Sequence, residues 1–394
     1  MPAELPGFYW DEERNRYFPL SSRPKTTLTP TVAPVAAHPP EGPRNFLSTH
    51  GRRRRPHALW DLTETLRNTV NYSKRYTLNH DILSEHYART SSLKNSIVPT
   101  FGTIKSFNTT IVDGQCRQFI GDSHGWLYSS TFDVEADWNT TSWSAELNLQ
   151  FDSEISTICI SGNNCAATCF GSTTRFSLMD LSDPARTSLF RLNSVYDVRA
   201  AHLEGSSLAL GAKSKAIYVS DINVFPPVQV LDTQSDVFSI YKQTDLVYTG
   251  SRNGSIRRFD LRIGKPRGQP LFDPRNEVSS PVLHLSVIRD FEMLLSRMNG
   301  DLATYDLRFL RLNHPIFRFP EHINTITQKL GIAVDPSEEF LFAAGEDRRI
   351  RGCFILIIAP PEPIFIVKLQ SYYAATYAID DVRKLNNDID IRPR

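Results

Sequence analysis

The stretch Asn253–Arg262 reads NGSIRRFDLR, and 46 positions later Asn299–Arg308 reads NGDLATYDLR. Each copy begins with Asn-Gly and ends in an aromatic residue followed by Asp-Leu-Arg. Asn-Gly between two apolar runs is typical of a tight hairpin turn, in which the backbone takes positive φ. The near-repetition therefore predicts one β unit used twice, each copy containing the turn between its second and third strands.

Six segments of the chain share this order of strand, Gly or Ser, polar turn and strand. They are FIGDSHGWLYSSTFD (Phe119–Asp133), CFGSTTRFSLMDL (Cys169–Leu181), ALGAKSKAIYVSDI (Ala209–Ile222), YTGSRNGSIRRFDLR (Tyr248–Arg262), LLSRMNGDLATYDLR (Leu294–Arg308) and FAAGEDRRIRGCFI (Phe342–Ile355). With Gly121, Gly171, Gly211, Gly250, Ser296 and Gly345 as markers, the intervals are 50, 40, 39, 46 and 49 residues. A four-stranded propeller blade takes about 40–45 residues. We therefore predict an all-β WD-repeat propeller of seven blades, six of them visible, because such rings usually close with about seven.

Composition divides the chain into five parts. We expect an aromatic and charged docking segment at 1–18 (LPGFYWDEERNRYF, Leu5–Phe18), and a disordered linker rich in Pro, Ser, Thr and Ala at 19–56. A helix-turn-helix is expected at 57–94, the propeller at 95–355, and a divergent C-terminal tail at 356–394. Part of that tail could belong to the last blade, since the seventh blade would need residues on both sides of the six visible repeats.

The helical prediction rests on apolar residues at helical spacing. Leu62, Leu66 and Val70 recur every fourth position, and Asp61 and Glu64 stand at the spacing of an N-terminal capping box. Such an amphipathic helix needs an apolar partner. The pair could pack on the propeller itself or enter a groove on another protein.

The remaining features argue against catalysis and against a membrane. The formal net charge is +1, and the longest apolar run, CFILIIA, is too short to span a bilayer. The five cysteines have neither a zinc-site spacing nor the pattern of a disulfide framework, and we expect buried free thiols in a nuclear or cytoplasmic protein. No phosphate loop, paired nucleophile and base, cofactor site or metal site is recognisable, so we expect a non-catalytic protein. Arg52–Arg55 is either a solvated charge cluster or a nuclear-entry signal or weak anion-binding patch, and nucleic-acid binding is not expected.

The arginines after the two Asp-Leu pairs are not needed to end a strand. Consecutive WD repeats ending in aromatic-Asp-x-Arg resemble the substrate receptors of cullin-4 RING ubiquitin ligases, and Phe259–Arg262 and Tyr305–Arg308 fit that pattern with aromatic residues in place of Trp. The Leu5–Phe18 segment is also similar to the N-terminal segment of the fourth member of the cullin-4-associated receptors.

The resemblance implies a role for named residues. Arg262 and Arg308 would contact the large adaptor of the ligase, with Asp260 and Asp306 holding the strand ends that aim them. A helical pair ahead of the propeller would enter a cavity of the adaptor, with the anchors Leu59, Leu62, Leu66 and Val70. The implied function is recruitment of an unknown protein substrate for ubiquitination by the cullin-4 RING complex. The alternative that the residues leave open is a WD-repeat scaffold without a ligase connection.

Overall fold

The computed structural model describes residues 8–11, 16–19, 98–133, 142–183, 186–224, 227–264, 267–272, 279–309, 314–326, 329–335, 338–355 and 365–368. The chain divides into two units, Met1–Pro56 and His57–Arg394. In the first unit β1 (Phe8–Asp11) and β2 (Arg16–Pro19) form an antiparallel hairpin that pairs Trp10 with Tyr17. Pro19, the first residue of the predicted linker, belongs to β2. The rest of that linker and the predicted helices at 57–94 lie outside the described residues, and so do the anchors Leu59, Leu62, Leu66 and Val70.

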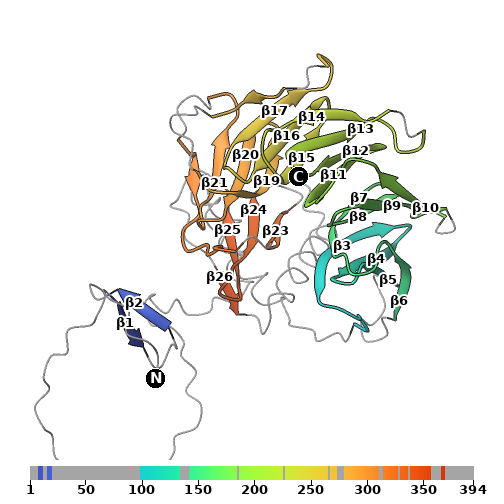
Figure 1. Cartoon of the computed structure of the whole chain (residues 1–394), viewed down its shortest axis with the longest axis horizontal. Helices are drawn as coiled ribbons and strands as arrows, with labels where there is room; N and C mark the ends of the chain where they lie inside the picture. The colour runs from blue at the N-terminus through green and yellow to red at the C-terminus, as the bar shows by residue number, and fades with distance from the viewer. Residues whose placement is uncertain are drawn as a thin grey trace, which may run out of the picture. The chain divides into compact units, whose positions relative to one another are not determined.

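The second unit contains six antiparallel four-stranded sheets, and each sheet takes four strands that are consecutive in the chain (Figure 1). Blade 1 holds β3 (Ile104–Val112), β4 (Gln115–Asp122), β5 (Trp126–Asp133) and β6 (Trp143–Asn148). Blade 2 holds β7 (Ile155–Ser161), β8 (Asn164–Cys169), β9 (Thr174–Asp180) and β10 (Thr187–Leu192). Blade 3 holds β11 (Ala200–Glu204), β12 (Ser207–Gly211), β13 (Lys215–Val219) and β14 (Gln229–Asp232).

Blade 4 holds β15 (Val237–Gln243), β16 (Leu246–Ser251), β17 (Ile256–Asp260) and β18 (Gln269–Pro270). Blade 5 holds β19 (Val282–Ile288), β20 (Glu292–Arg297), β21 (Leu302–Asp306) and β22 (Phe317–Arg318). Blade 6 holds β23 (Ile332–Val334), β24 (Phe340–Ala344), β25 (Arg349–Phe354) and β26 (Phe365–Lys368). Six blades are thus found among the described residues where seven were expected, and the fourth strand of the sixth comes from the divergent C-terminal segment.

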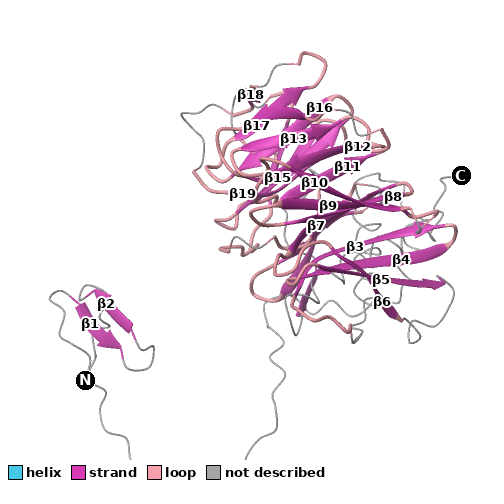
Figure 2. Ribbon diagram, turned by 45° about the vertical axis from the view of Figure 1, so that its right-hand side comes forward, coloured by secondary structure: helices cyan, strands magenta, loops and turns pink. Residues whose placement is uncertain are grey.

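Blades 1 to 5 each pack a face of their sheet against the next blade, and Figure 2 shows the sheets of blades 1 to 4 following one another. Apolar clusters join blades 1 and 2, 2 and 3, 3 and 4, 4 and 5, and 5 and 6. The second strand of a blade has neighbours on both faces, and β12, β20 and β24 are buried at every position. This double burial explains why β12 and β24 consist of continuous apolar and small residues rather than an alternating pattern, and β20 does so between its buried charged ends, Glu292 and Arg297.

Some of the glycines used as sequence markers mark a close approach between blades. A Cβ atom on Gly250 would lie 2.6 Å from Val282 Cγ1 of the next blade, and one on Gly211 would lie 2.6 Å from Val237 Cγ1. Gly171 and Gly345 are different, because they lie in the turns beyond the ends of β8 and β24. The intervals between markers are therefore uneven in part because some markers lie within a second strand and others lie in the turn that follows it.

The two Asn-Gly turns differ in one detail from the sequence prediction. The glycines take the positive φ, with +88° at Gly254 and +83° at Gly300. Each asparagine instead uses its side chain: Asn253 Oδ1 accepts a hydrogen bond from the backbone N–H of Ser255 at 3.1 Å. Asn299 Oδ1 does the same for Asp301 at 3.1 Å. Asparagine is thus selected here for its side-chain acceptor.

Candidate functional site

One backbone hydrogen bond defines an equivalent turn after the third strand of five blades. The donors are the N–H groups of Leu181, Ile222, Leu261, Leu307 and Ile355, and the acceptors are carbonyls in the turn between the first two strands of the same blade, at 2.7–3.0 Å. Asp180, Asp221, Asp260 and Asp306 come directly before the first four donors. In blade 6 Phe354 takes that position, so the aspartate turn is present in blades 2 to 5.

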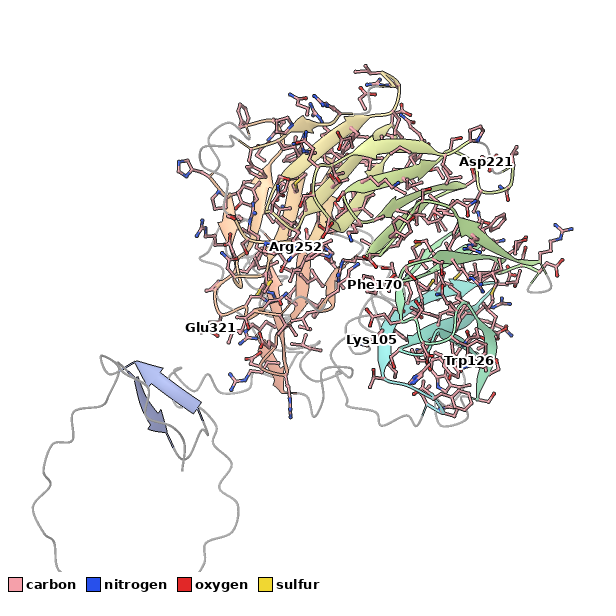
Figure 3. The ribbon with its side chains drawn as sticks, in the orientation of Figure 1. Lys105, Trp126, Phe170, Asp221, Arg252 and Glu321 are labelled. Carbon is pink, nitrogen blue, oxygen red and sulfur yellow. The ribbon has the colours of Figure 1, made fainter. Side chains whose placement is uncertain are left out.

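The aspartate side chain closes each of these four turns locally. Its Oδ1 accepts a hydrogen bond from the backbone N–H two residues later, at 2.9 Å for Ser182, 2.9 Å for Asn223, 3.1 Å for Arg262 and 2.8 Å for Arg308. This is the turn that aspartate favours, because its short carboxylate reaches its own backbone two residues on. Figure 3 labels Asp221 in the loop that follows β13. The third residue of the turn is therefore held in the same place in each blade, and it is arginine in blades 4 and 5.

In blade 4 the Arg262 guanidinium forms a two-point contact with its own aspartate. Its Nε donates to Asp260 Oδ1 at 3.0 Å and its Nη2 donates to Asp260 Oδ2 at 2.8 Å. Asp245 Oδ2, in the turn between β15 and β16, lies 4.0 Å from the Nε. The side chain of Arg262 is nevertheless 69% exposed, so the guanidinium is oriented without being buried.

Blade 5 repeats this contact and adds an aromatic platform. Arg308 Nε donates to Asp306 Oδ1 at 2.9 Å and Nη2 donates to Asp306 Oδ2 at 2.8 Å. The Arg308 Cζ also lies 4.1 Å from the ring centroid of Phe291, which belongs to the turn between β19 and β20. Stacking and a bidentate carboxylate contact are both geometries that arginine makes and lysine does not. The Arg308 side chain is 58% exposed.

The electrostatics follow from these contacts. The hydrogen bond from each arginine is the main reason that the pKa values of Asp260 and Asp306 lie below the usual range. The same contacts raise the pKa values of Arg262 and Arg308, so both turns stay charged throughout the physiological range. Each guanidinium has five N–H donors and gives two to its aspartate. The other three have no hydrogen bond to any described residue and remain available to a carboxylate or carbonyl on another molecule.

The structure therefore brings the four predicted residues of the paired motif into equivalent turns of adjacent blades. Since β17 and β21 are the third strands of blades 4 and 5, both turns lie on the same face of the propeller (Figure 1). We call this face, defined by the turns at 260–263 and 306–309, the arginine face. Phe291 and Asp245 also belong to this face. They were not predicted, because each comes from the turn between the first and second strands of its blade, a whole strand away from the arginine.

A second arginine contact, on the opposite face of the propeller, was also not predicted from the sequence. The Arg199 Cζ lies 4.5 Å from the ring centroid of Phe170 and 4.8 Å from that of Phe238. The three residues come from blades 2, 3 and 4, and Phe170 is labelled in Figure 3. Arg199 thus links three blades at one point, a contact that sequence spacing could not reveal.

Potential metal ligands and thiols are the remaining chemical groups of interest among the described residues. No group of three or more His, Cys, Asp or Glu residues in them could hold a metal ion. All five cysteines are free and buried, as expected, and burial raises the pKa values of the Cys159 and Cys353 thiols to about 12. Helices long and apolar enough to cross a membrane do not occur in the described part of the chain.

Comparison with known proteins identifies a distant relative. The human protein DDB1- and CUL4-associated factor 4 is 22% identical over 411 residues, an alignment that covers 95% of this chain and 80% of the human protein. The chain is a distant homologue of DDB1- and CUL4-associated factor 4. The resemblance inferred from the paired motif is thereby confirmed, while the arginine roles that it implies stay a prediction.

Two further similarities agree with the fold. The Schizosaccharomyces pombe protein named WD repeat-containing protein 21 is 28% identical over 127 residues, 31% of this chain and 30% of the yeast protein. The crystal structure of the WD40 β-propeller domain of Doa1 superimposes with a TM-score of 0.54 at 12% identity, covering 72% of this chain and 87% of that one. No family model matches the sequence. The all-β WD40-like propeller predicted from the repeats is confirmed.

Proposed function

We propose that this chain is the substrate-recognition subunit of a cullin-4 RING ubiquitin ligase and that the arginine face binds the adaptor DDB1. The observation that carries the proposal is the pair of identical Asp-Leu-Arg turns in adjacent blades, each presenting an exposed guanidinium held by its own aspartate. The name of the human homologue, DDB1- and CUL4-associated factor 4, suggests which adaptor this is.

The turn geometry supports binding because the arginines are ordered before any partner arrives. An arginine that is already held loses less side-chain entropy on association than a free one. The available N–H donors match carboxylate and carbonyl groups on a protein surface. Two such points in neighbouring blades would fix the orientation of the propeller as well as its affinity.

The role of the chain in ubiquitination is positional. A receptor that holds its target beside the ubiquitin-transferring enzyme raises the effective concentration of the two reactants and supplies no catalytic group of its own. The arginine face occupies one side of the propeller, which leaves the other face and the Leu5–Phe18 segment as places for the substrate. The segment at 57–94, with Leu59, Leu62, Leu66 and Val70, would form a second contact with DDB1.

The test is direct binding of purified DDB1 to the full-length chain. We expect Arg262→Ala plus Arg308→Ala to weaken binding at least about tenfold, since each hydrogen bond to a charged group contributes ~1.5–3 kcal/mol. Ser182→Ala plus Asn223→Ala is the matched control, because these residues occupy the same turn position in blades 2 and 3. If the double arginine variant folds normally and binds DDB1 as well as the native chain does, the adaptor role of these arginines is wrong. A native chain that does not bind DDB1 would favour the scaffold alternative.

A further inference from the structure

The residue that follows each arginine of the arginine face is a large apolar side chain exposed to solvent. Ile263 follows Arg262 and is 59% exposed, and Phe309 follows Arg308 and is 67% exposed. Single exposed apolar residues are common on protein surfaces and need no special explanation. Here, however, an exposed apolar residue occupies the same turn position in both blades that carry an arginine, and this repetition needs an explanation.

Backbone geometry shows that the two positions are equivalent. The N–H of Ile263 donates to the Asp260 carbonyl at 3.3 Å, and the N–H of Phe309 donates to the Asp306 carbonyl at 3.1 Å. Each segment is thus a four-residue turn that begins at the aspartate. The second residue, Leu261 or Leu307, packs against the apolar cluster that its own blade shares with the preceding blade. The third and fourth residues are left exposed, so each turn displays an arginine beside an apolar side chain.

The equivalent turns of blades 2 and 3 lack this combination. In blade 2 the turn closes in the same way, with the N–H of Asp183 donating to the Asp180 carbonyl at 3.2 Å, and its last two residues are Ser182 and Asp183. In blade 3 the fourth residue, Val224, is 75% exposed, but Asn223 precedes it. Among the aspartate turns that the structure describes, the Arg-plus-apolar pair occurs in blades 4 and 5, which are neighbours.

Arginine and aromatic residues such as phenylalanine are enriched at the centres of protein interfaces, where residues that fill well-packed pockets carry most of the binding energy. An apolar side chain that enters a pocket on a partner gains about 25 cal/mol for each Å² removed from water. It also excludes water from the neighbouring hydrogen bonds of the arginine, which strengthens them. In blade 5 the Arg308 Cζ lies 5.7 Å from the Phe309 ring centroid, so the two side chains can meet one partner surface together.

We propose that Ile263 and Phe309 are direct contacts to DDB1, each filling an apolar pocket beside the acceptor of the preceding arginine. This inference rests on the proposed function and extends it: each turn would contact DDB1 through an arginine and an apolar side chain instead of through an arginine alone. The complementary surface would carry two apolar depressions, each bordered by a backbone carbonyl or a carboxylate. Specificity would then come from the spacing of the two pairs, because a surface with acceptors alone would leave Ile263 and Phe309 against water.

The experiment compares three full-length variants in binding to purified DDB1 at several salt concentrations. Ile263→Ser plus Phe309→Ser keeps both arginines, Arg262→Ala plus Arg308→Ala keeps both apolar residues, and Val224→Ser removes an equally exposed apolar residue from a turn without arginine. We expect the first variant to weaken binding at least tenfold while preserving the salt dependence of the native chain. The arginine variant should weaken binding and flatten the salt dependence, because screening acts on the charged contacts. Val224→Ser should change affinity less than twofold.

The possible failures are distinguishable. If the arginine variant loses binding while the Ile263→Ser plus Phe309→Ser variant binds like the native chain, the apolar contacts are wrong and the proposed function stands. If Val224→Ser weakens binding as much as the apolar double variant does, the pairing of each apolar residue with an arginine is wrong. If the native chain does not bind DDB1, both proposals fall together. Thermal unfolding of every variant verifies that the exposed substitutions leave the fold intact.

Discussion

The guanidinium of Arg308 lies over the ring of Phe291 at 4.1 Å while the carboxylate of Asp306 holds it at two points. The corresponding arginine of blade 4, Arg262, has the same carboxylate contact but an acidic neighbour, Asp245, in place of the ring. The two arginines are therefore equally oriented by their turns and differently supported by the turn next to them.

This difference predicts how much DDB1 affinity changes when each arginine is replaced by lysine. Arg308→Lys removes the planar two-point contact and the stacking on Phe291, whereas Arg262→Lys keeps a cation between Asp260 and Asp245. We expect DDB1 affinity to fall more for Arg308→Lys than for Arg262→Lys, by about tenfold in the first case. Calorimetric or interferometric titration of DDB1 against both variants measures this. Equal losses for the two variants would contradict the role assigned to the Phe291 platform.

A second prediction concerns the aspartate that aims the arginine. Asp306→Asn retains an oxygen acceptor but replaces the second one with an amide donor, which repels the Arg308 Nη2 group. We expect weaker DDB1 binding with only a small change in stability, since an exposed ion pair contributes at most about 1 kcal/mol. Asp180→Asn in blade 2, where Ser182 replaces the arginine, serves as the matched control and should leave binding unchanged. Thermal unfolding and DDB1 titration of both variants decide the matter.

The close approach of blades 4 and 5 gives a prediction about stability. Gly250→Ala would place a Cβ atom 2.6 Å from Val282 Cγ1 and 2.3 Å from Ser239 Oγ. Overpacking of this kind costs about 1–3 kcal/mol. We expect a lower unfolding temperature for Gly250→Ala, and a smaller loss when it is introduced into a Val282→Ala background, measured by scanning calorimetry of both single variants and the double variant. If the two losses simply add, the contact with Val282 is not the cause.

The buried imidazole of His322 gives a prediction about pH. Burial is the main reason, and the nearby Arg351 the next, that the pKa of His322 is lowered to about 4 from its ordinary 6.5. Between these values the unfolded chain binds a proton that the folded chain does not, so stability falls as the pH decreases from about 6.5 towards 4. The loss attributable to this group is on the order of 3 kcal/mol. Urea unfolding at pH 7 and pH 4.5 should show a smaller difference for His322→Gln than for the native chain, and an unchanged difference would refute the assignment.

The sequence was sufficient for the fold because the information is repeated. Six turns with apolar runs on both sides, such as the one at Asn253–Gly254, predict the propeller even though no single repeat does. The number of blades was harder to predict: the part of the chain that the structure describes contains six where seven were expected, since the count depends on residues around the divergent segment after Ile355. The reason for glycine at position 250 could not be predicted from the sequence either, because the side chain that leaves no room for a Cβ atom there is Val282 of the next blade.

The site was predictable to the extent that it is local. Asp260, Arg262, Asp306 and Arg308 are visible in the sequence because each aspartate contacts an arginine two residues away. Phe291 stacks on Arg308 from a turn that precedes it by a whole strand, and its role depends on strand pairing. Ile263 and Phe309 stand directly after the two arginines in the sequence, but a sequence does not tell whether an apolar turn residue is buried or exposed. Their exposure is known only from the structure.

Every described blade is built from four strands that follow one another in the chain, and this has a consequence for synthesis. The backbone pairing of a blade can be completed as soon as its own segment has left the ribosome, without waiting for a strand from the far end of the chain. What a newly made blade lacks is the apolar face of its successor. A nascent chain of this protein would therefore always expose one unsatisfied sheet face, which moves forward by one blade as each new segment emerges.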